Sequence, residues 1–413
     1  MDQKPTSLLI ITADSPESYS PAGERLRNLA LASGSKFNKV MVLALQRSKE
    51  KGRQESRESK VSLYTVNFSR AVPFPFSVLF DPVKMLMLLV HSLVLYNHIK
   101  PSHVLASMPP LETGLSAWLL TRFRHAKLVI DLRDDWESAV GTMLEPYFPR
   151  TSMKVLSVVA NKIYSAAFAI FAVTQTIADT LRRRGVATSI LLVPNGADTS
   201  IFTSATSKIR VKIRLQRALP LEKLVFVYCG NGISPYYRLD LILSSVKTLP
   251  ENVVEKLFFV FYVYNGLESL NKLKRQLAIP DGVMEIRNPL PRNQLAQVLA
   301  ACDVGLVPFD ARPYLLCARS TKLYEYLSAG LFVISSGPKN GELDTLFSTS
   351  SVLGSFSLPS TENFTRSFTC LLRNAEDMLN NEKREIRNSF IRRNYDRRSI
   401  LKEAMTTILE HTN

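Results

Sequence analysis

"STKLYEYLSAGLFVIS", residues 320–335, reads as a short helix joined directly to a buried strand. Apolar residues recur at helical spacing over 323–327, and Gly330 ends the helix before the next apolar run. Lys322 and Glu325 lie three residues apart and therefore share one face of that helix. The stretch predicts a helix–strand unit of an α/β fold, and it leaves open whether the two charges are solvated or bind a ligand.

The same alternation of short apolar strands and amphipathic helices runs along almost the whole chain, and such alternation predicts parallel sheets covered on both faces. It pauses after "PNGADTSIF" (194–202) and then restarts. We therefore expect two doubly wound, Rossmann-like domains that face each other across a cleft, with ligands at the carboxyl ends of the strands. The expected strands are 7–13, 39–45, 61–68, 103–107, 127–132, 169–174 and 190–194, then 223–230, 256–263, 283–288, 303–309 and 331–336.

The restart sets the expected domain boundaries. Residues 1–205 form the expected N-terminal Rossmann-like domain, and residues 206–389 form the expected C-terminal Rossmann-like domain. A helix over about 390–413 is a candidate for packing back on the first domain.

Composition favours a globular chain without a membrane span. The 413 residues are 46% hydrophobic and 21% charged. No secretory signal is recognised, and the longest apolar stretches are too short or too polar to cross a bilayer. The four cysteines have neither disulfide nor zinc-site spacing. A cytoplasmic location is the expectation.

The net charge of +16 requires either a polyanionic partner or a highly solvated surface. Basic residues concentrate in 46–60, a polar loop, and in 382–402, a helical tail. Both read equally well as solvated faces. Aromatic residues are not interleaved with them and no nucleic-acid-binding signature occurs, so nucleic acid is not an expected partner.

Residues 72–98, "VPFPFSVLFDPVKMLMLLVHSLVLYNH", allow two interpretations. The first is an irregular loop followed by a helix buried in the first domain. The second is a membrane-facing segment in which Phe74, Phe76 and Phe80 enter the interface of an anionic bilayer.

Polar residues follow the ends of two expected strands in the first domain. Gly23 opens the helix after the first strand, where backbone N–H groups can approach an anion. Asp134, in "KLVIDLRDDWE" (127–137), follows the fifth strand beside a tryptophan, a setting that suits recognition of a hydroxyl group. A helix cap is the alternative for Asp134.

The second domain carries the sharpest basic feature, "VYCGNGISPYYRLDLILSSV" (227–246). Gly230 and Asn231 end its strand, and Arg238 begins the next helix, so a phosphate could approach the backbone and meet a cation. Lys322 follows another strand and could bind the same diphosphate. Glu325 could then accept hydrogen bonds from two ribose hydroxyls.

These stretches, in this order, resemble a GT-B fold glycosyltransferase of the large retaining family 4, which includes capsule, O-antigen and lipopolysaccharide sugar transferases. The matching segments are "RDDWE" (133–137), "FAVTQTIADTLRRRGV" (171–186), "VPNGADTSIF" (193–202), "YCGNG" (228–232), "YYRLDLIL" (236–243), "LAACDVGLVPF" (299–309) and "STKLYEYLSAGLFVISS" (320–336).

The resemblance implies a retaining, metal-independent hexosyltransferase without a cofactor. Its substrates are a nucleotide diphosphate sugar and the hydroxyl of a glycan or lipid-linked acceptor, and its place is peripheral on the inner face of the cell membrane. The leaving phosphate takes the acceptor's proton, since His103 and His125 are expected to be structural.

The resemblance also assigns residues. The basic pair that binds the diphosphate falls on Arg238 and Lys322, and the aspartate of the D-x-W loop falls on Asp134; these three are the expected catalytic residues. The second glutamate of the E-x7-E motif falls on Glu325, whereas the first falls on Cys317, where the family holds the donor sugar. The expected donor-binding residues are Gly23, Gly230, Asn231, Thr321, Glu325 and Cys317. Two rival interpretations stay open, an inactive glycosyltransferase-like scaffold and a basic polyanion-binding protein.

Overall fold

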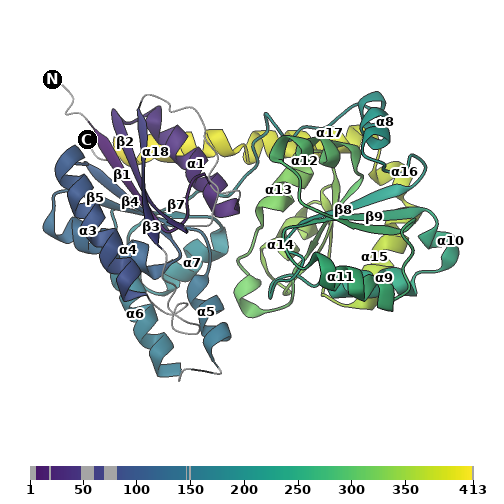
Figure 1. Ribbon diagram of the computed structural model, residues 1–413, viewed down its shortest axis with the longest axis horizontal. Coiled ribbons are helices and arrows are strands. Elements are labelled where there is room, and N and C mark those ends of the chain that lie inside the picture. Colours follow the sequence, from purple (N-terminus) through teal and green to yellow (C-terminus); the bar gives the residue numbers. More distant parts are fainter. Residues whose placement is uncertain are drawn as a thin grey trace. The chain divides into compact units, whose positions relative to one another are not determined.

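The computed structural model describes residues 6–17, 20–47, 60–68, 81–145, 147 and 150–411. The chain divides into two compact units, Met1–Pro194 with Arg398–Asn413, and Asn195–Arg397 (Figure 1). The predicted interfacial phenylalanines Phe74, Phe76 and Phe80 lie outside the described residues, as does most of the basic loop 46–60.

The first unit is built on a parallel sheet with the strand order β3-β2-β1-β4-β5-β6-β7 in its described residues. Leu8 and Ile10 of β1 face one side of the sheet, Leu9 and Ile11 face the other, and all four are fully buried. Helices therefore cover both faces, as the near-continuous apolar strands predict. The strands are β1 Ser7–Thr12, β2 Lys39–Arg47, β3 Val61–Phe68, β4 His103–Met108, β5 Lys127–Leu132, β6 Ala169–Ala172 and β7 Ser189–Leu192. The helices are α1 Pro21–Gly34, α3 Pro82–Ile99, α4 Leu111–Phe123, α5 Trp136–Leu144, α6 Arg150–Ala166, α7 Gln175–Arg183 and α18 Arg397–Glu410.

The second unit repeats this architecture with the strand order β10-β9-β8-β11-β12-β13, which is the order of a dinucleotide-binding sheet. Its strands are β8 Leu224–Gly230, β9 Leu257–Val263, β10 Met284–Arg287, β11 Val304–Pro308, β12 Phe332–Ser336 and β13 Gly354–Ser357. Its helices are α8 Ser207–Gln216, α9 Leu239–Thr248, α10 Glu251–Val254, α11 Leu267–Gln276, α12 Arg292–Ala301, α13 Thr321–Ser328, α14 Glu342–Thr349, α15 Thr361–Arg373, α16 Ala375–Met378 and α17 Asn381–Asn394, with a 3-10 turn at Pro313–Leu315. The predicted α/β class and both parallel sheets are confirmed; β13 is an additional edge strand that the sequence did not predict.

The C-terminal segment forms two helices rather than the single one expected. The break lies at Asp396, which pairs with Ala197 in an isolated bridge. Helix α17 belongs to the second unit, and α18 packs its apolar side, including Leu401 and Met405, into the core of the first unit beside α1 (Figure 1). The helix that returns to the first unit thus begins at residue 397, not near 390.

The division between the units falls at 194/195, eleven residues before the predicted boundary at 205/206. The intervening segment is fastened to the second unit. Arg397 donates to the carbonyl oxygens of Asn195 (2.8 Å) and Gly196 (2.9 Å), and Ser328 Oγ donates to the carbonyl of the fully buried Phe202 (2.5 Å). These partners are distant in sequence, which is why the pause in the strand pattern did not reveal them.

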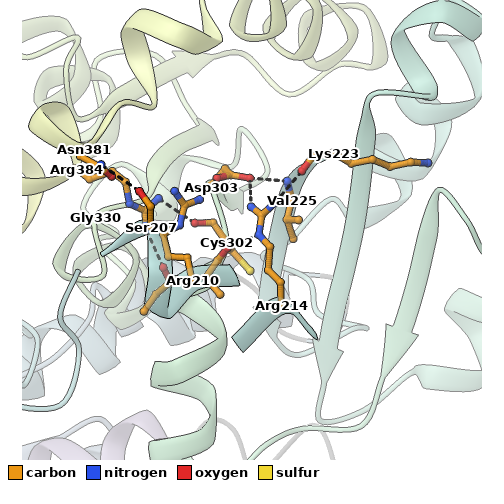
Figure 2. A network of polar contacts seen from close by, with 12 residues as sticks. Ser207, Arg210, Arg214, Lys223, Val225, Cys302, Asp303, Gly330, Asn381 and Arg384 are labelled. Carbon is orange, nitrogen blue, oxygen red and sulfur yellow. Dashed lines mark hydrogen bonds and ion pairs between the residues drawn. The ribbon is translucent and has the colours of Figure 1, made fainter. Parts of the chain in front are cut away.

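Buried arginines anchor α8 and α17 to the second sheet (Figure 2). Asp303 accepts from Arg210, from Arg214 Nη2 (2.6 Å) and from the backbone N–H of Val225 (2.8 Å). Arg384 donates to the carbonyls of Cys302 (2.9 Å), Ala300 (2.9 Å) and Ala329 (3.2 Å). Arg384 and Arg214, which also donates to the carbonyl of Ala301 (3.0 Å), thus provide donors for buried backbone carbonyl groups.

This network corrects one part of the interpretation of 382–402, that its basic residues form a solvated face. Three of its arginines, Arg384, Arg387 and Arg397, are buried. Desolvation lowers the pKa of Arg384 to about 9 and that of Arg387 to about 10, so their charges serve the interior of the second unit. The other basic residues of the segment, Lys383, Arg392, Arg393, Arg398 and Lys402, are exposed or half-buried.

Helix α3 is buried on one side only, which corrects the prediction of a fully buried helix. Leu88, Leu95 and Ile99 are buried, whereas the opposite face is an exposed apolar stripe of Val83, Leu86, Val90 and Val94, each 48–60% accessible. Among the described residues α3 is the one helix whose length and composition would allow a membrane span, a test that core helices also pass.

Candidate functional site

The candidate site of the second unit lies where the strand order reverses, between β8 and β11. Ligands of open α/β sheets bind at the carboxyl ends of strands at this point. Here β8 ends at Gly230, whose φ of +149° disfavours a side chain. A Cβ atom on Gly230 would lie 2.6 Å from Lys322 Nζ and 3.2 Å from Tyr228 Oη. Only glycine therefore lets the Lys322 amine lie against the end of this strand.

Lys322 points its amine between two tyrosine rings. Nζ lies 4.1 Å from the ring centroid of Tyr228 and 3.8 Å from that of Tyr237. Part of the Lys322 residue is accessible, but the amine nitrogen itself is buried, and it has no hydrogen-bond partner among the described residues. Desolvation lowers the pKa of Lys322 to about 7, and the nearby carboxylate of Glu325 opposes this effect. A cationic group is thus held ready without an acidic partner in contact.

Arg238 lies at the N-cap of α9 and is partly exposed. Its backbone N–H donates to Pro308 at the end of β11 (2.7 Å). Its guanidinium pairs with Asp240 (2.8 Å) and lies 3.7 Å from Asp310. Hydrogen bonding to Asp240 is the main cause that raises the pKa of Arg238. The predicted second cation is therefore at the same edge of the sheet, and it has two carboxylates as partners.

Glu325 is buried on the helix that carries Lys322, in α13. Its carboxylate lies 3.4 Å from Arg292 and 4.0 Å from Arg397. The charged face seen in the sequence is thus directed into the protein rather than solvated. Arg292 and Arg397 come from the starts of α12 and α18, and sequence spacing could not pair them with Glu325.

The other donor-binding predictions for this unit fall close by. The carbonyl of Asn231 accepts from Tyr228 Oη (2.7 Å), which fixes the loop after β8. Thr321 is the first residue of α13, directly before Lys322. Cys317 is buried, and its Sγ donates to the carbonyl of Tyr314 (3.3 Å). A thiol therefore stands at the position that the resemblance assigns to the first glutamate of the E-x7-E motif.

The predicted residues of the first unit lie at the corresponding edge of the first sheet. Gly23 is in the first turn of α1, and its N–H donates to Ser20 Oγ (3.0 Å). Asp134 follows β5, and desolvation raises its pKa to about 6 against the opposing charges of Arg133 and Arg25. The Asp134 residue is exposed, so water offsets part of this effect and its direction matters more than its size.

Beneath them lies a buried ion pair that the sequence did not single out. Arg25 Nη2 lies 2.6 Å from Asp131 and also donates to the carbonyl of Val193 (3.0 Å). His103, in β4, lies between the rings of Phe37 and Phe168, and desolvation lowers its pKa to about 4. A structural role for His103 agrees with this setting.

Sequence reasoning missed the two tyrosines that surround Lys322. Their signal was available in part, because Tyr228 stands two residues before Gly230 and Tyr237 directly precedes Arg238. Their convergence on Lys322 depends on how α13, far away in the sequence, packs beside the end of β8 and the start of α9.

Comparison with known proteins places this architecture. Residues 22–196 match the family model described as "Glycosyl transferase 4-like domain". The search of curated proteins found no match. Sucrose-phosphate synthase from Thermosynechococcus elongatus has a similar structure, with a TM-score of 0.75, 12% identity and coverage of 98% of this chain and 99% of that one.

Two further solved structures are similar over their full length. One is WaaG, a glycosyltransferase involved in lipopolysaccharide biosynthesis, with a TM-score of 0.69, 12% identity and coverage of 98% and 99%. The other is Anabaena HepE in complex with UDP, with a TM-score of 0.68, 12% identity and coverage of 98% and 100%. The predicted fold, two Rossmann-like units as in these solved structures, is thereby confirmed, and residues 22–196 of the chain are similar to a glycosyl transferase 4-like domain.

Proposed function

We propose that the chain is a glycosyltransferase that moves a sugar from a nucleotide diphosphate sugar to an acceptor hydroxyl. The observation that carries this proposal is the buried amine of Lys322, held at Gly230 without a hydrogen-bond partner among the described residues. A diphosphate at the end of β8 would supply the missing anion. HepE, which has a similar fold, has been solved with UDP and with UDP-glucose.

The chemistry requires stabilisation of a leaving diphosphate. The bond between the anomeric carbon and the diphosphate oxygen breaks, the acceptor oxygen bonds to that carbon, and the acceptor's proton passes to the leaving phosphate. Lys322 and Arg238 would stabilise the negative charge that develops on the diphosphate, and a single such donor typically contributes about 10²–10³ in rate. Because two cations are available, we propose that transfer does not require a metal; retention of configuration is proposed from the resemblance to a retaining family.

The remaining residues have supporting roles in this proposal. Glu325 accepts hydrogen bonds from the ribose, and Gly230, Asn231 and Thr321 surround the phosphates. For the first unit, the sequence resemblance is the basis for proposing that Gly23 serves donor binding and that Asp134 accepts a hydrogen bond from a sugar or acceptor hydroxyl.

The test is release of nucleoside diphosphate from a panel of UDP-, GDP- and dTDP-sugars, with a glycan or lipid-linked acceptor extract and with EDTA in a parallel reaction. The proposal expects nucleoside diphosphate release with at least one donor, at the same rate with and without EDTA. It also expects NMR of the product to show the same anomeric configuration as the donor sugar. Binding of a nucleotide without release would favour the alternative, a scaffold that binds donors without transfer. The buried thiol of Cys317 in place of a carboxylate is the observation that favours this alternative.

We also propose that the chain works at the inner face of the cell membrane, with α3 rather than the basic tail as the contact. The exposed stripe of Val83, Leu86, Val90 and Val94 is an apolar face of the kind that enters a bilayer interface. Tyr96 lies in the last turns of α3, and the guanidinium carbon of the exposed Arg124 is 5.7 Å from the centroid of its ring. An exposed cation at this end of α3 could contact anionic headgroups.

Co-sedimentation with phosphatidylglycerol-containing vesicles tests this contact. Serine at Leu86, Val90 and Val94 should reduce binding, whereas serine at the equally exposed Ile209 and Val211 of α8 should leave it unchanged. Equal binding by both variants would remove α3 from the contact.

A further inference from the structure

Lys322 is enclosed by aromatic rings rather than by acids. The two centroid distances, 4.1 Å to Tyr228 and 3.8 Å to Tyr237, are well within the range at which a cation is attracted to a ring face. We propose that Tyr228 and Tyr237 are positioning residues, which hold the Lys322 amine against Gly230 at the place where a donor diphosphate binds. This inference rests on the function proposed for the site.

The rings can position the lysine because other contacts fix them. Tyr237 stacks on Phe309 with centroids 5.0 Å apart and planes 12° apart, and the two residues pair through their backbones. Tyr228 contacts Phe261 edge-to-face, with centroids 5.7 Å apart, and its hydroxyl is engaged by the carbonyl of Asn231. The rings of Tyr228 and Tyr237, which together form an aromatic cage around the Lys322 amine, are therefore in place before a ligand arrives.

The cage also explains how a lysine can stay at this position without an acid. A buried ammonium ion without an anion is costly, and most proteins supply a carboxylate. A carboxylate in contact with Lys322 would compete with the phosphates of the donor. Ring faces stabilise the cation in part and leave its N–H groups available, so the amine is ordered and still free to bind an anion.

The two tyrosines divide the work. Tyr237 contacts the amine with the face of its ring, which phenylalanine would keep. Tyr228 adds a hydroxyl that fixes the Asn231 carbonyl, and it therefore links the lysine to the loop that would contact the phosphates.

A double-mutant cycle on the full chain tests the inference, with the affinities for UDP and GDP measured by calorimetry. Tyr237→Phe should stay within about twofold of the wild type, and Tyr237→Leu should bind about five- to thirtyfold more weakly through loss of ring contact and order. In a Lys322→Met background, Tyr237→Leu should cause no further loss, because the lysine through which the ring acts is gone. Tyr237→Met, which fills similar space without a ring, repeats the test if the leucine variant does not fold.

The outcomes separate the inference from the function on which it rests. Wild-type affinity in the leucine and methionine variants, or an equal loss with and without Lys322, would overturn the positioning role while nucleotide binding stands. Failure of the wild-type chain to bind either nucleotide would overturn the function itself, and the inference with it.

Discussion

Oε1 of Glu325 lies 3.4 Å from Nη2 of Arg292, so the carboxylate expected to bind ribose already has a cationic neighbour. Arg397, 4.0 Å away and 2% exposed, is a second one. The two arginines place positive charge beside Glu325 and help fix its direction at the edge of the second sheet. A ribose would then meet a carboxylate whose position is set by the protein.

Replacing Glu325 by glutamine should weaken nucleoside diphosphate binding by about 1–3 kcal/mol, since charge-assisted hydrogen bonds to the ribose are lost while the shape is kept. Titration calorimetry with UDP and GDP measures this. Glu385→Gln, which changes an exposed glutamate paired with Arg392 at 3.7 Å, is the matched control and should bind like the wild type. Unchanged affinity in Glu325→Gln would assign the residue to its arginine partners alone.

Donor binding should depend on pH through Lys322. Its pKa in the free protein is about 7, and a bound diphosphate favours the cation and raises that pKa. Affinity is therefore greatest below pH 7 and falls, by up to about tenfold per pH unit, as the pH rises from 7 toward the pKa of the bound state. The nucleotide contributes little to this change because its terminal phosphate has a pKa near about 6.

The groups around Lys322 should not add a pH dependence of their own to nucleotide affinity. Cys229 and Tyr228 stay neutral because burial raises the pKa of each. Glu325 stays paired with Arg292. UDP titrations between pH 7 and 9 should show the decline in the wild type and a flat profile in Lys322→Met. A flat wild-type profile would mean that the tyrosine rings keep Lys322 charged throughout.

Replacing Arg238 should lower turnover, whereas replacing its neighbour Arg312 should not. Both arginines lie near Asp310, at 3.7 Å and 3.1 Å, but Arg238 begins α9 at the end of the central strands. Arg238→Ala should lower turnover by about 10²–10³ through loss of charge stabilisation. Arg312→Ala should leave it within about twofold, as measured by nucleoside diphosphate release. Equal effects of the two changes would point to the loop's structure rather than to a catalytic cation.

The buried pair of Arg25 and Asp131 should stabilise the first unit. Asp131→Asn leaves Arg25 as a buried cation without its anion, which typically costs about 3–5 kcal/mol. Both tryptophans, Trp118 and Trp136, belong to this unit, so fluorescence in urea reports its unfolding selectively. Asp179→Asn, which removes an exposed pair with Arg182, should cost less than about 1 kcal/mol. A similar small cost for Asp131→Asn would show that the buried pair is replaceable.

The strands were predictable because their signal is local. Apolar runs between turn residues define β8 or β9 without reference to any other part of the chain. The edge strand β13, Gly354–Ser357, escaped because its "GSFS" sequence has one apolar residue and is recognisable only by pairing with β12. The burial of Arg384 in the segment 382–402 was not predictable, because an arginine in a polar helix is normally a surface residue. Its carbonyl partners, such as Cys302, are distant in the sequence.

The candidate site divides in the same way. Lys322 and Arg238 stood out because a cation after a strand end is unusual in the printed sequence alone. The ring contacts of Lys322 and the arginine partners of Glu325 depend on how distant elements pack, and no spacing rule encodes them.

The most direct test of the central claim is calorimetric titration of UDP and GDP into the wild-type chain and into Lys322→Met. The account predicts that the wild type binds at least one of the two nucleotides and that Lys322→Met binds it at least tenfold more weakly, with unchanged thermal unfolding. Equal affinity in the two proteins, or no binding of either nucleotide by the wild type, would contradict a diphosphate site at Gly230 and Lys322.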